Sequence, residues 1–180
     1  MRTEILTVAP AGTWQLDPVH SHVGFEIGYL GGAFKGEFQK VAAQLTQDDL
    51  DARLEGVAEV GSVDVKDENL AAHLLAPDFF DAERHPQLRF SAEQIALDGE
   101  VVKVDGEVTI KGVTKPVTVT GTAMAPVTDY SGNERIGLQM ETTVDRTEFG
   151  VDWNAQLPSG EQALSNDVKV TAQLFFVKAE

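Results

Sequence analysis

The chain has 180 residues, no cysteine and a formal net charge of −15, from 29 acidic and 14 basic residues. This length suits one domain with a sizeable core. The charge disfavours nucleic acid and anionic membrane surfaces as partners, because the sequence offers no basic patch for either. The lack of cysteine excludes thiol catalysis, disulfides and thiolate metal sites.

The N-terminal segment has neither the cationic start nor the continuous apolar run of a secretory signal, and no stretch approaches the ~20 apolar residues of a membrane span. We therefore expect a cytoplasmic protein without stable membrane insertion. Residues 1–12 are predicted to be a flexible tail, and residues 13–180 to be the single domain. A homodimer is left open.

Eight segments alternate apolar and polar residues with a period of two, which is typical of strands with one buried face. Turn-forming Gly, Asp and Asn residues separate most of them, which predicts antiparallel hairpins. The segments are 20–29, 33–45, 51–63, 87–95, 101–111, 116–125, 135–144 and 167–178.

One amphipathic helix is predicted between the third and fourth strands, in the sequence KDENLAAHLLAP. Asp67 or Asp64 can cap its N-terminus, and Pro77 ends it. Its apolar stripe consists of Leu70, Ala71, Leu74 and Leu75.

Eight antiparallel strands with one apolar face each can close into a barrel, which removes exposed sheet edges. We therefore predict a mainly β protein, an eight-stranded antiparallel barrel with the helix and Phe79-Phe80 at one end. A β-sandwich is the competing architecture, because the spacing of short strands does not separate the two.

The interior of an eight-stranded barrel is either filled by side chains or able to hold one small ligand. Small residues on the presumed inner face, at Gly36, Gly56, Ala58 and Gly106, would leave space along the axis. The alternative is that these glycines relieve curvature or mark bulges. Strands of roughly 10 residues, at about 3.3 Å each and tilted by about 40°, make a lumen on the order of 25 Å long, which suits a long, thin ligand.

Five motifs follow one another along nearly the whole chain. They consist of Trp14, Leu16, Asp17, Pro18, His20, Ser21, Val23 and Phe25; Gly36 and Phe38; His73, Leu74, Asp78, Phe79, Phe80, Asp81, Pro86, Phe90 and Ser91; Gly106, Thr109, Ile110, Gly112, Val113, Thr114, Lys115, Pro116 and Val117; and Arg146, Phe149, Gly150 and Trp153. In type, spacing and order these residues resemble the motifs of the YceI-like proteins, which are lipid- or polyisoprenoid-binding barrels.

The resemblance implies a lipocalin-like barrel with the helical segment at one end and an isoprenoid chain in the lumen. The sequence departs from the family pattern at Tyr29, where the family usually has His, and at Leu70 and Ala71, where it usually has Arg-Asp. The lost charged pair weakens the expectation of a head-group contact beside the helix.

We predict a non-enzymatic protein that binds, stores or transports a long-chain isoprenoid lipid, with a polyprenyl or quinone tail, and that needs no metal or other cofactor. His73 is a possible polar contact, although packing is the stronger interpretation for this residue. The apolar residues predicted to line the lumen are Phe25, Ile27, Tyr29, Phe34, Phe38, Leu54, Val60, Leu74, Phe79, Phe80, Val104, Val108, Leu138, Met140, Leu174 and Phe176.

Two other functions stay open. A redox or stress-response enzyme acting on a bound quinone would need a proton donor, and Tyr29 and His73 are the candidates. A filled barrel would instead be a scaffold that binds another protein with its outer face.

Several polar groups invite a catalytic or metal-binding interpretation that we set against a structural one. Asp17, His20 and His22 contain the residue types of a metal site. Asp17, His20 and Ser21 contain those of a hydrolase triad. A local turn accounts for both sets better. Arg146 with Asp145 and Glu148 is interpreted as an ion-pair cluster at a strand end, and Trp14 and Trp153 as packing residues.

Overall fold

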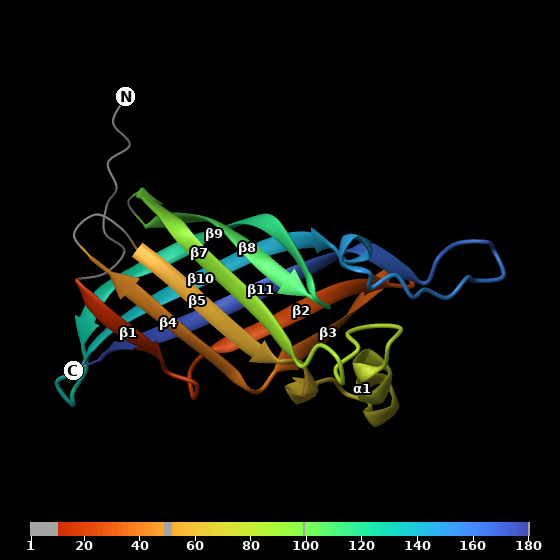
Figure 1. The fold of residues 1–180 in the computed structure, drawn as a ribbon, viewed down its shortest axis with the longest axis horizontal. Helices are drawn as coiled ribbons and strands as arrows, with labels where there is room; N and C mark the ends of the chain where they lie inside the picture. The colour runs from red at the N-terminus through yellow and green to blue at the C-terminus, as the bar shows by residue number, and fades with distance from the viewer. Residues whose placement is uncertain (1–10, 49–51, 99, 180) are drawn as a thin grey trace.

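A computed structural model describes residues 11–48, 52–98 and 100–179, which form an elongated β-barrel (Figure 1). Most of the predicted tail, residues 1–12, lies outside the described residues. The strands are β1 (Gly12–Leu16), β2 (His22–Tyr29), β3 (Gly32–Phe38), β4 (Val41–Gln47), β5 (Ala52–Glu59), β6 (Val63–Asp64), β7 (Gln87–Asp98), β8 (Val101–Ile110), β9 (Val113–Thr128), β10 (Glu134–Asp145) and β11 (Leu164–Lys178). One α-helix, α1 (Glu68–Leu75), and two 3-10 turns, η1 (Val60–Ser62) and η2 (Arg146–Phe149), complete the described elements.

The sheet closes on itself through antiparallel neighbours. Its order is β1-β4-β5-β7-β8-β9-β10-β11, and β11 pairs back with β1. Further along, β11 also pairs with β2, β2 with β3, and β3 with β6. The segments β1 and β2 therefore act as two halves of one bent strand, and β3 and β4 as two halves of another. The predicted eight-stranded antiparallel barrel, with one helix between its third and fourth strands, is confirmed, and the β-sandwich is wrong.

The bend between β1 and β2 is built by the first motif. Asp17 Oδ1 accepts a hydrogen bond from the Val19 amide, and Asp17 Oδ2 bonds His20 Nδ1 at 2.6 Å. The Ser21 hydroxyl then accepts the Phe175 amide at 3.0 Å, where a backbone partner would stand in a regular ladder. The sequence prediction starts the first strand at residue 20 and misses β1, because five residues before an Asp-Pro turn are too few to show a period.

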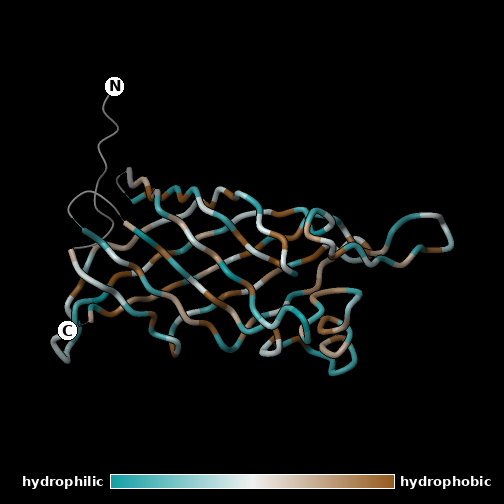
Figure 2. The backbone as a smooth tube through the Cα atoms, viewed as in Figure 1, coloured by the Kyte–Doolittle hydropathy of each residue, from teal (hydrophilic) through white to brown (hydrophobic). Residues whose placement is uncertain are grey.

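The barrel interior contains two hydrophobic clusters, one in each half. The half near the C-terminus is filled by the cluster of Trp14, Leu45, Ala52, Leu54, Ala92, Ile95, Val102, Val104, Val119, Ile136, Leu138, Met140, Leu174 and Phe176. The half near α1 contains Phe25, Ile27, Phe38, Ala58, Val63, Leu74, Phe79, Phe149, Val151, Leu164 and Val168. Apolar and polar residues alternate along the strands around both clusters (Figure 2).

Helix α1 lies at the end of the barrel away from the C-terminus (Figure 1). Its cap is Asp67, whose side chain accepts the amides of Asn69 and Leu70, so the predicted Asp67 cap is confirmed. The helix ends before Pro77, as predicted, and Leu74 is its most deeply buried side chain. None of the described helices has the length and apolar character needed to cross a membrane.

The β8–β9 hairpin connects the sheet to the α1 end. Lys111 and Gly112 form its two-residue turn with φ of 52° and 78°, the positive values that favour glycine and match the strand twist. The Lys111 ammonium donates hydrogen bonds to the carbonyl oxygens of Pro77 and Gly150. One lysine therefore joins the helix exit to the loop that follows η2.

Candidate functional site

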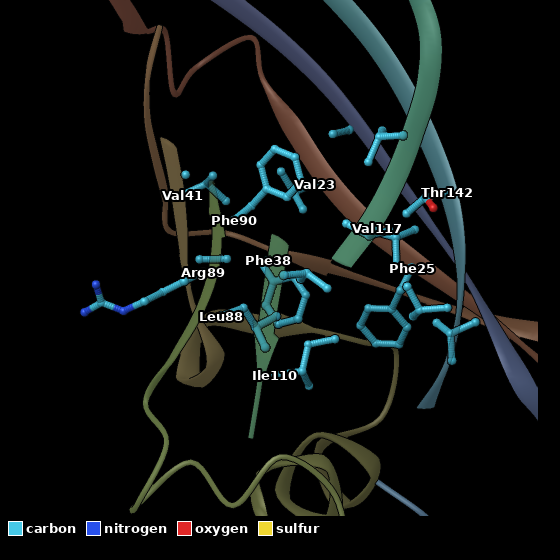
Figure 3. A pocket seen from close by; sticks show the side chains of 18 of the residues that line it. Val23, Phe25, Phe38, Val41, Leu88, Arg89, Phe90, Ile110, Val117 and Thr142 are labelled. Carbon is cyan, nitrogen blue, oxygen red and sulfur yellow. The ribbon is translucent and has the colours of Figure 1, made fainter. Parts of the chain in front are cut away.

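An apolar cavity of about 210 Å³ occupies the half of the barrel beside α1. In Figure 3 the rings of Phe25, Phe38 and Phe90 project into it, and α1 lies beyond one end. Its wall consists of Val23, Phe25, Ile27, Phe38, Val41, Ala43, Leu54, Gly56, Val57, Ala58, Leu74, Phe79, Phe80, Leu88, Arg89, Phe90, Val108, Ile110, Val117, Val119, Met140, Thr142, Val144, Arg146, Val151, Val168, Val170, Ala172 and Leu174. A pocket with almost no polar groups selects for hydrocarbon.

The segment after α1 forms the end wall of the cavity. Its backbone folds back on the helix, because the amides of Phe80, Asp81 and Ala82 donate to the carbonyl oxygens of Leu74, Ala76 and Leu75. This return places Phe79 and Phe80 against the barrel. The Phe80 ring meets Phe25 and Phe38 edge-on, with centroids 6.5 and 6.1 Å apart.

Small side chains create the space in this half. Gly56 and Ala58 on β5 face the cavity, and a Cβ built on Gly56 would meet nothing closer than 3.8 Å. These two positions agree with the prediction that small inner-face residues leave room along the axis.

Gly36 and Gly106 do not create space, which corrects their interpretation as cavity residues. A Cβ at Gly36 would overlap the Phe25 ring, which lies directly over that glycine. A Cβ at Gly106 would lie 2.5 Å from the Ser91 carbonyl oxygen, beside the register shift between Ala92 and Gln94. These glycines allow close packing at an aromatic ring and at a bulge, as the alternative interpretation has it.

The structure distributes the predicted lumen residues between the cavity wall and other places. Those in the wall are Phe25, Ile27, Phe38, Leu54, Leu74, Phe79, Phe80, Val108, Met140 and Leu174. Val104, Leu138 and Phe176 lie in the filled cluster, Val60 is buried in η1, and Tyr29 and Phe34 lie outside the wall. Tyr29 is 46% exposed and is not part of the cavity wall. Whether the wall residues bind a ligand stays a prediction.

Sequence reasoning missed wall residues from strands whose inner face it did not single out. Val41 and Ala43 on β4, Leu88 and Phe90 on β7, and Val170 on β11 are examples. The alternating pattern already places them on the inner side, so the signal was available in the period of two. The position of a residue along the barrel axis decides whether it lines the cavity or lies in the filled core, and the period of two does not report that position.

His73 packs at the edge of the end wall rather than inside the cavity. Its ring meets Phe79 and Trp153 edge-on, with centroids 4.8 and 4.7 Å apart, and its Nε2 lies 3.6 Å from an Asp78 oxygen. Trp14 is wholly buried in the filled half. The packing interpretations of His73, Trp14 and Trp153 are confirmed.

Arg146 is a buried charged residue that belongs to the cavity wall, and its environment corrects the ion-pair interpretation. Only 4% of its surface is exposed, and Nε and Nη1 donate to the carbonyl oxygens of Ser165, Val151 and Trp153. Asp145 instead accepts the Thr147 amide and caps η2, and Glu148 is exposed. Arg146 therefore organises the loop after η2 by binding neutral carbonyls.

The polar cluster of the first motif lies away from the cavity. Asp17 Oδ2 bonds His20 and also Arg135 Nη1, at 2.9 Å. Partial burial alone would raise the pKa of Asp17, but the hydrogen bonds from His20, Arg135 and Val19 outweigh it and lower this pKa to about 2. His22 pairs separately with Glu37. In the part of the chain that the structure describes, no group of His, Asp or Glu is arranged to hold a metal ion.

Comparison with known proteins places the chain in a family. The profile of the YceI-like domain matches residues 14–176. The chain belongs to the YceI-like family. The resemblance drawn from the five motifs is therefore confirmed.

Related proteins agree with this assignment. A UPF0312 protein of Pectobacterium carotovorum is 29% identical over 136 residues, which cover 73% of this chain and 71% of that protein. The crystal structure of BcnA from Burkholderia cenocepacia superposes with a TM-score of 0.75 at 22% identity, over 89% of this chain and 98% of that one. The structure of a polyisoprenoid-binding domain from Saccharophagus degradans, implicated in plant cell wall breakdown, superposes with a TM-score of 0.68 at 14% identity, over 92% of this chain and 98% of that one. At these identities the solved structures show a shared fold.

Proposed function

We propose that this YceI-like protein binds the hydrocarbon chain of an isoprenoid lipid in the cavity beside α1, and stores or carries that lipid without chemically changing it. The observation that carries the proposal is a closed barrel with a 210 Å³ cavity whose wall is almost wholly apolar. The polyisoprenoid binding of the Saccharophagus degradans domain supports it by likeness of fold.

The energetics favour an occupied cavity. Water in an apolar cavity finds few hydrogen-bond partners on the wall, so hydrocarbon is the favoured occupant. Burial of hydrocarbon contributes about 0.8 kcal/mol per methylene, so an apolar chain that fills the cavity binds without a polar anchor.

Binding is favoured over quinone chemistry by the position of the candidate proton donors. Neither Tyr29 nor His73 belongs to the described cavity wall. The filled-scaffold alternative fits one half of the barrel and not the other, since the half beside α1 has open space.

Mass spectrometry of the purified protein, native and then after organic extraction, tests the proposal directly. We expect an isoprenoid lipid at up to one molecule per chain, or uptake of a polyprenol when it is offered. A protein that stays empty under both conditions contradicts the proposal.

The variant Gly56→Leu locates the binding site. It should fill the space beside β5 and reduce lipid loading severalfold while the protein still folds, because Gly56 faces the cavity and a Cβ at this position meets nothing closer than 3.8 Å. Glu55→Leu adds a similar side chain to the exposed outer face of the same strand and is the matched control. Equal loading of both variants would mean that the lipid binds elsewhere.

A further inference from the structure

The chain between β6 and β7 is folded on itself and not into the sheet. We call residues 65–85, which contain α1 and the end wall of the cavity, the α1 segment. Its backbone hydrogen bonds, beyond those within the helix, join members of the segment to one another, from Ala71 with Asp67 to His85 with Asp81. In the described part of the chain, none of these backbone bonds reaches a strand. The α1 segment can therefore move without breaking a barrel ladder.

Both ends of the α1 segment are fixed to the barrel. Directly before it, Asp64 of β6 pairs with Glu37 of β3. Directly after it, the carbonyl oxygen of Pro86 accepts the amide of Val60. These two attachments leave the segment between them as one body that can turn about its ends.

One lysine joins the α1 segment to the strands. Lys111 in the β8–β9 turn donates from Nζ to the carbonyl oxygen of Pro77 at 2.6 Å. Between the α1 segment and the rest of the described chain, this is the single hydrogen bond that the structure shows. The same ammonium donates to the carbonyl oxygen of Gly150 at 3.1 Å, which fixes Lys111 on the barrel side. Lys111 is therefore placed to hold the segment closed.

The strand next to the α1 segment has an unpaired edge (Figure 1). β3 pairs with β2 along its whole length, but its other edge pairs with β6 only at its last two residues. Residues 32–36 have no strand partner on that side in the described chain. Side chains fill the gap instead, since Val65 packs beside Gly36 and the Phe80 ring meets the Phe38 ring. This seam between β3 and the α1 segment is closed by apolar contacts.

A row of aromatic rings connects the surface with the cavity along this seam. Tyr29, which is half-exposed, meets Phe34 edge-on with centroids 6.4 Å apart, and Phe34 meets Phe25 at the same distance. Phe25 belongs to the cavity wall and also contacts Phe80 of the α1 segment. A hydrocarbon chain that follows these rings keeps apolar contacts between the surface and the cavity, so little of it is exposed to water on the way.

We infer that the α1 segment is a lid, that it opens along the seam with β3 to let the lipid enter and leave the cavity, and that Lys111 holds it closed. This inference rests on the proposed function, since it requires a lipid in the cavity. Other routes are more costly. A path between β10 and β11 breaks a continuous ladder, and the far end of the barrel is filled by the cluster around Trp14.

The first experiment closes the lid covalently. The chain has no cysteine, so Lys111→Cys together with Asp78→Cys introduces two thiols, one in the β8–β9 turn and one beside Pro77. A bismaleimide whose spacer contains a disulfide joins them, and a reductant cuts the spacer again. We expect the joined protein to take up and release geranylgeraniol about tenfold more slowly, or slower still, than the same protein after reduction.

The matched control joins two residues that the sheet already holds together. Lys103→Cys with Thr120→Cys places the same reagent across directly opposite positions of β8 and β9, on the exposed face. This protein should exchange geranylgeraniol equally fast before and after reduction. A joined lid that exchanges as fast as its reduced form overturns the inference.

The second experiment releases the lid. Lys111→Met should speed uptake and release of geranylgeraniol together, by about three- to tenfold, the range typical of one lost hydrogen bond. The dissociation constant should stay nearly unchanged, because a lid changes the barrier in both directions, whereas a residue that only shapes the cavity would change affinity. Lys111→Arg retains the cation and should restore part of the slow exchange. Lys103→Met removes an exposed lysine from β8 and is the control for charge.

The two proposals fail in different ways. Failure of the unaltered protein to bind geranylgeraniol contradicts the proposed function, and the lid inference with it. Binding at rates that neither the spacer nor Lys111→Met changes overturns the lid alone and leaves the proposed function intact. Far-ultraviolet circular dichroism shows that each variant is folded before its rates are compared.

Discussion

The two halves of this barrel are built from the same strands and the same alternating pattern, yet one is filled and the other is hollow. In the filled half, Trp14, Phe176 and Leu45 come from the neighbouring strands β1, β11 and β4 and are wholly buried in one cluster. In the hollow half, Gly56 and Ala58 face the interior, and the α1 segment closes the end. The difference shows that side-chain volume, and not strand geometry, decides where an eight-stranded barrel has room for a ligand.

The largest effect should come from truncating the filled half. Trp14→Ala removes a fully buried side chain from a close-packed cluster, which should cost about 3–5 kcal/mol in the free energy of unfolding, or prevent folding. Phe80→Ala removes a half-buried ring from the wall of an existing cavity and should cost less than half as much. Urea denaturation of both variants measures the difference, and similar losses would show that the halves are equally packed.

The same substitution, glycine to alanine, should have opposite effects at Gly106, which is closely packed, and at Gly56, which faces the cavity. Gly106→Ala should cost about 1–3 kcal/mol of stability, because its Cβ would lie 2.5 Å from a backbone oxygen that cannot move away. Gly56→Ala should be neutral or stabilise the protein by up to ~1 kcal/mol, since its Cβ enters the cavity and the unfolded chain loses freedom. Midpoints of thermal unfolding rank the two variants, and the reverse order would contradict the placement of the cavity.

Helix α1, which contributes Leu74 to the wall of the hollow half, begins at the Asp67 cap. Asp67→Ala removes the acceptor of two backbone amides and should cost about 1 kcal/mol. We expect the loss to appear first as faster amide hydrogen exchange in α1, with little change in the β10–β11 ladder. If the cavity binds a lipid as we propose, the same variant should release it faster. Asp67→Asn keeps an acceptor oxygen and is the control. Uniformly faster exchange across the whole barrel would show that α1 is not a separate cover.

A similarly small effect, which depends on pH, is expected at the polar bend between β1 and β2. The folded pKa of Asp17, about 2, lies below its ordinary value of 3.8, so its contribution to stability is fully present above pH 3.8 and is lost as the pH falls towards 2. Asp17→Asn should therefore cost about 1 kcal/mol at neutral pH and almost nothing near pH 2. Urea titrations at both pH values test this, and a cost that does not change with pH would exclude the ionised carboxylate as its source.

Much of the fold could be predicted because its determinants are local. The alternating residues of β8, from Val102 to Ile110, specify one buried face, and Asp67 specifies the start of α1. The sequence did not predict that β1 continues through the bend at Asp17 into β2. At this bend the Ser21 hydroxyl accepts the amide of Phe175 on β11, 154 residues away, in place of a backbone carbonyl.

The candidate site was predictable only in part. The alternation placed Phe25 and Phe176 equally on the inner face, but one lines the cavity and the other fills the core. Gly56 and Gly106 look alike in the sequence, and their roles differ because a ring and a bulged strand approach only Gly106. Arg146 looked like a surface ion pair because two acidic residues lie within two positions of it.

The sequence by itself determined the family, the number of barrel strands, the place of the helix and the apolar character of the interior. These properties follow from periodicity and from motifs whose residues are close together in the chain. Only the tertiary structure decided which half is hollow and that Arg146 is buried. The hollow half depends on side chains that different strands bring together from distant parts of the sequence. The burial of Arg146 depends on how the chain after η2 folds back to present the carbonyl oxygens of Val151, Trp153 and Ser165, and no local pattern of residues reports that path.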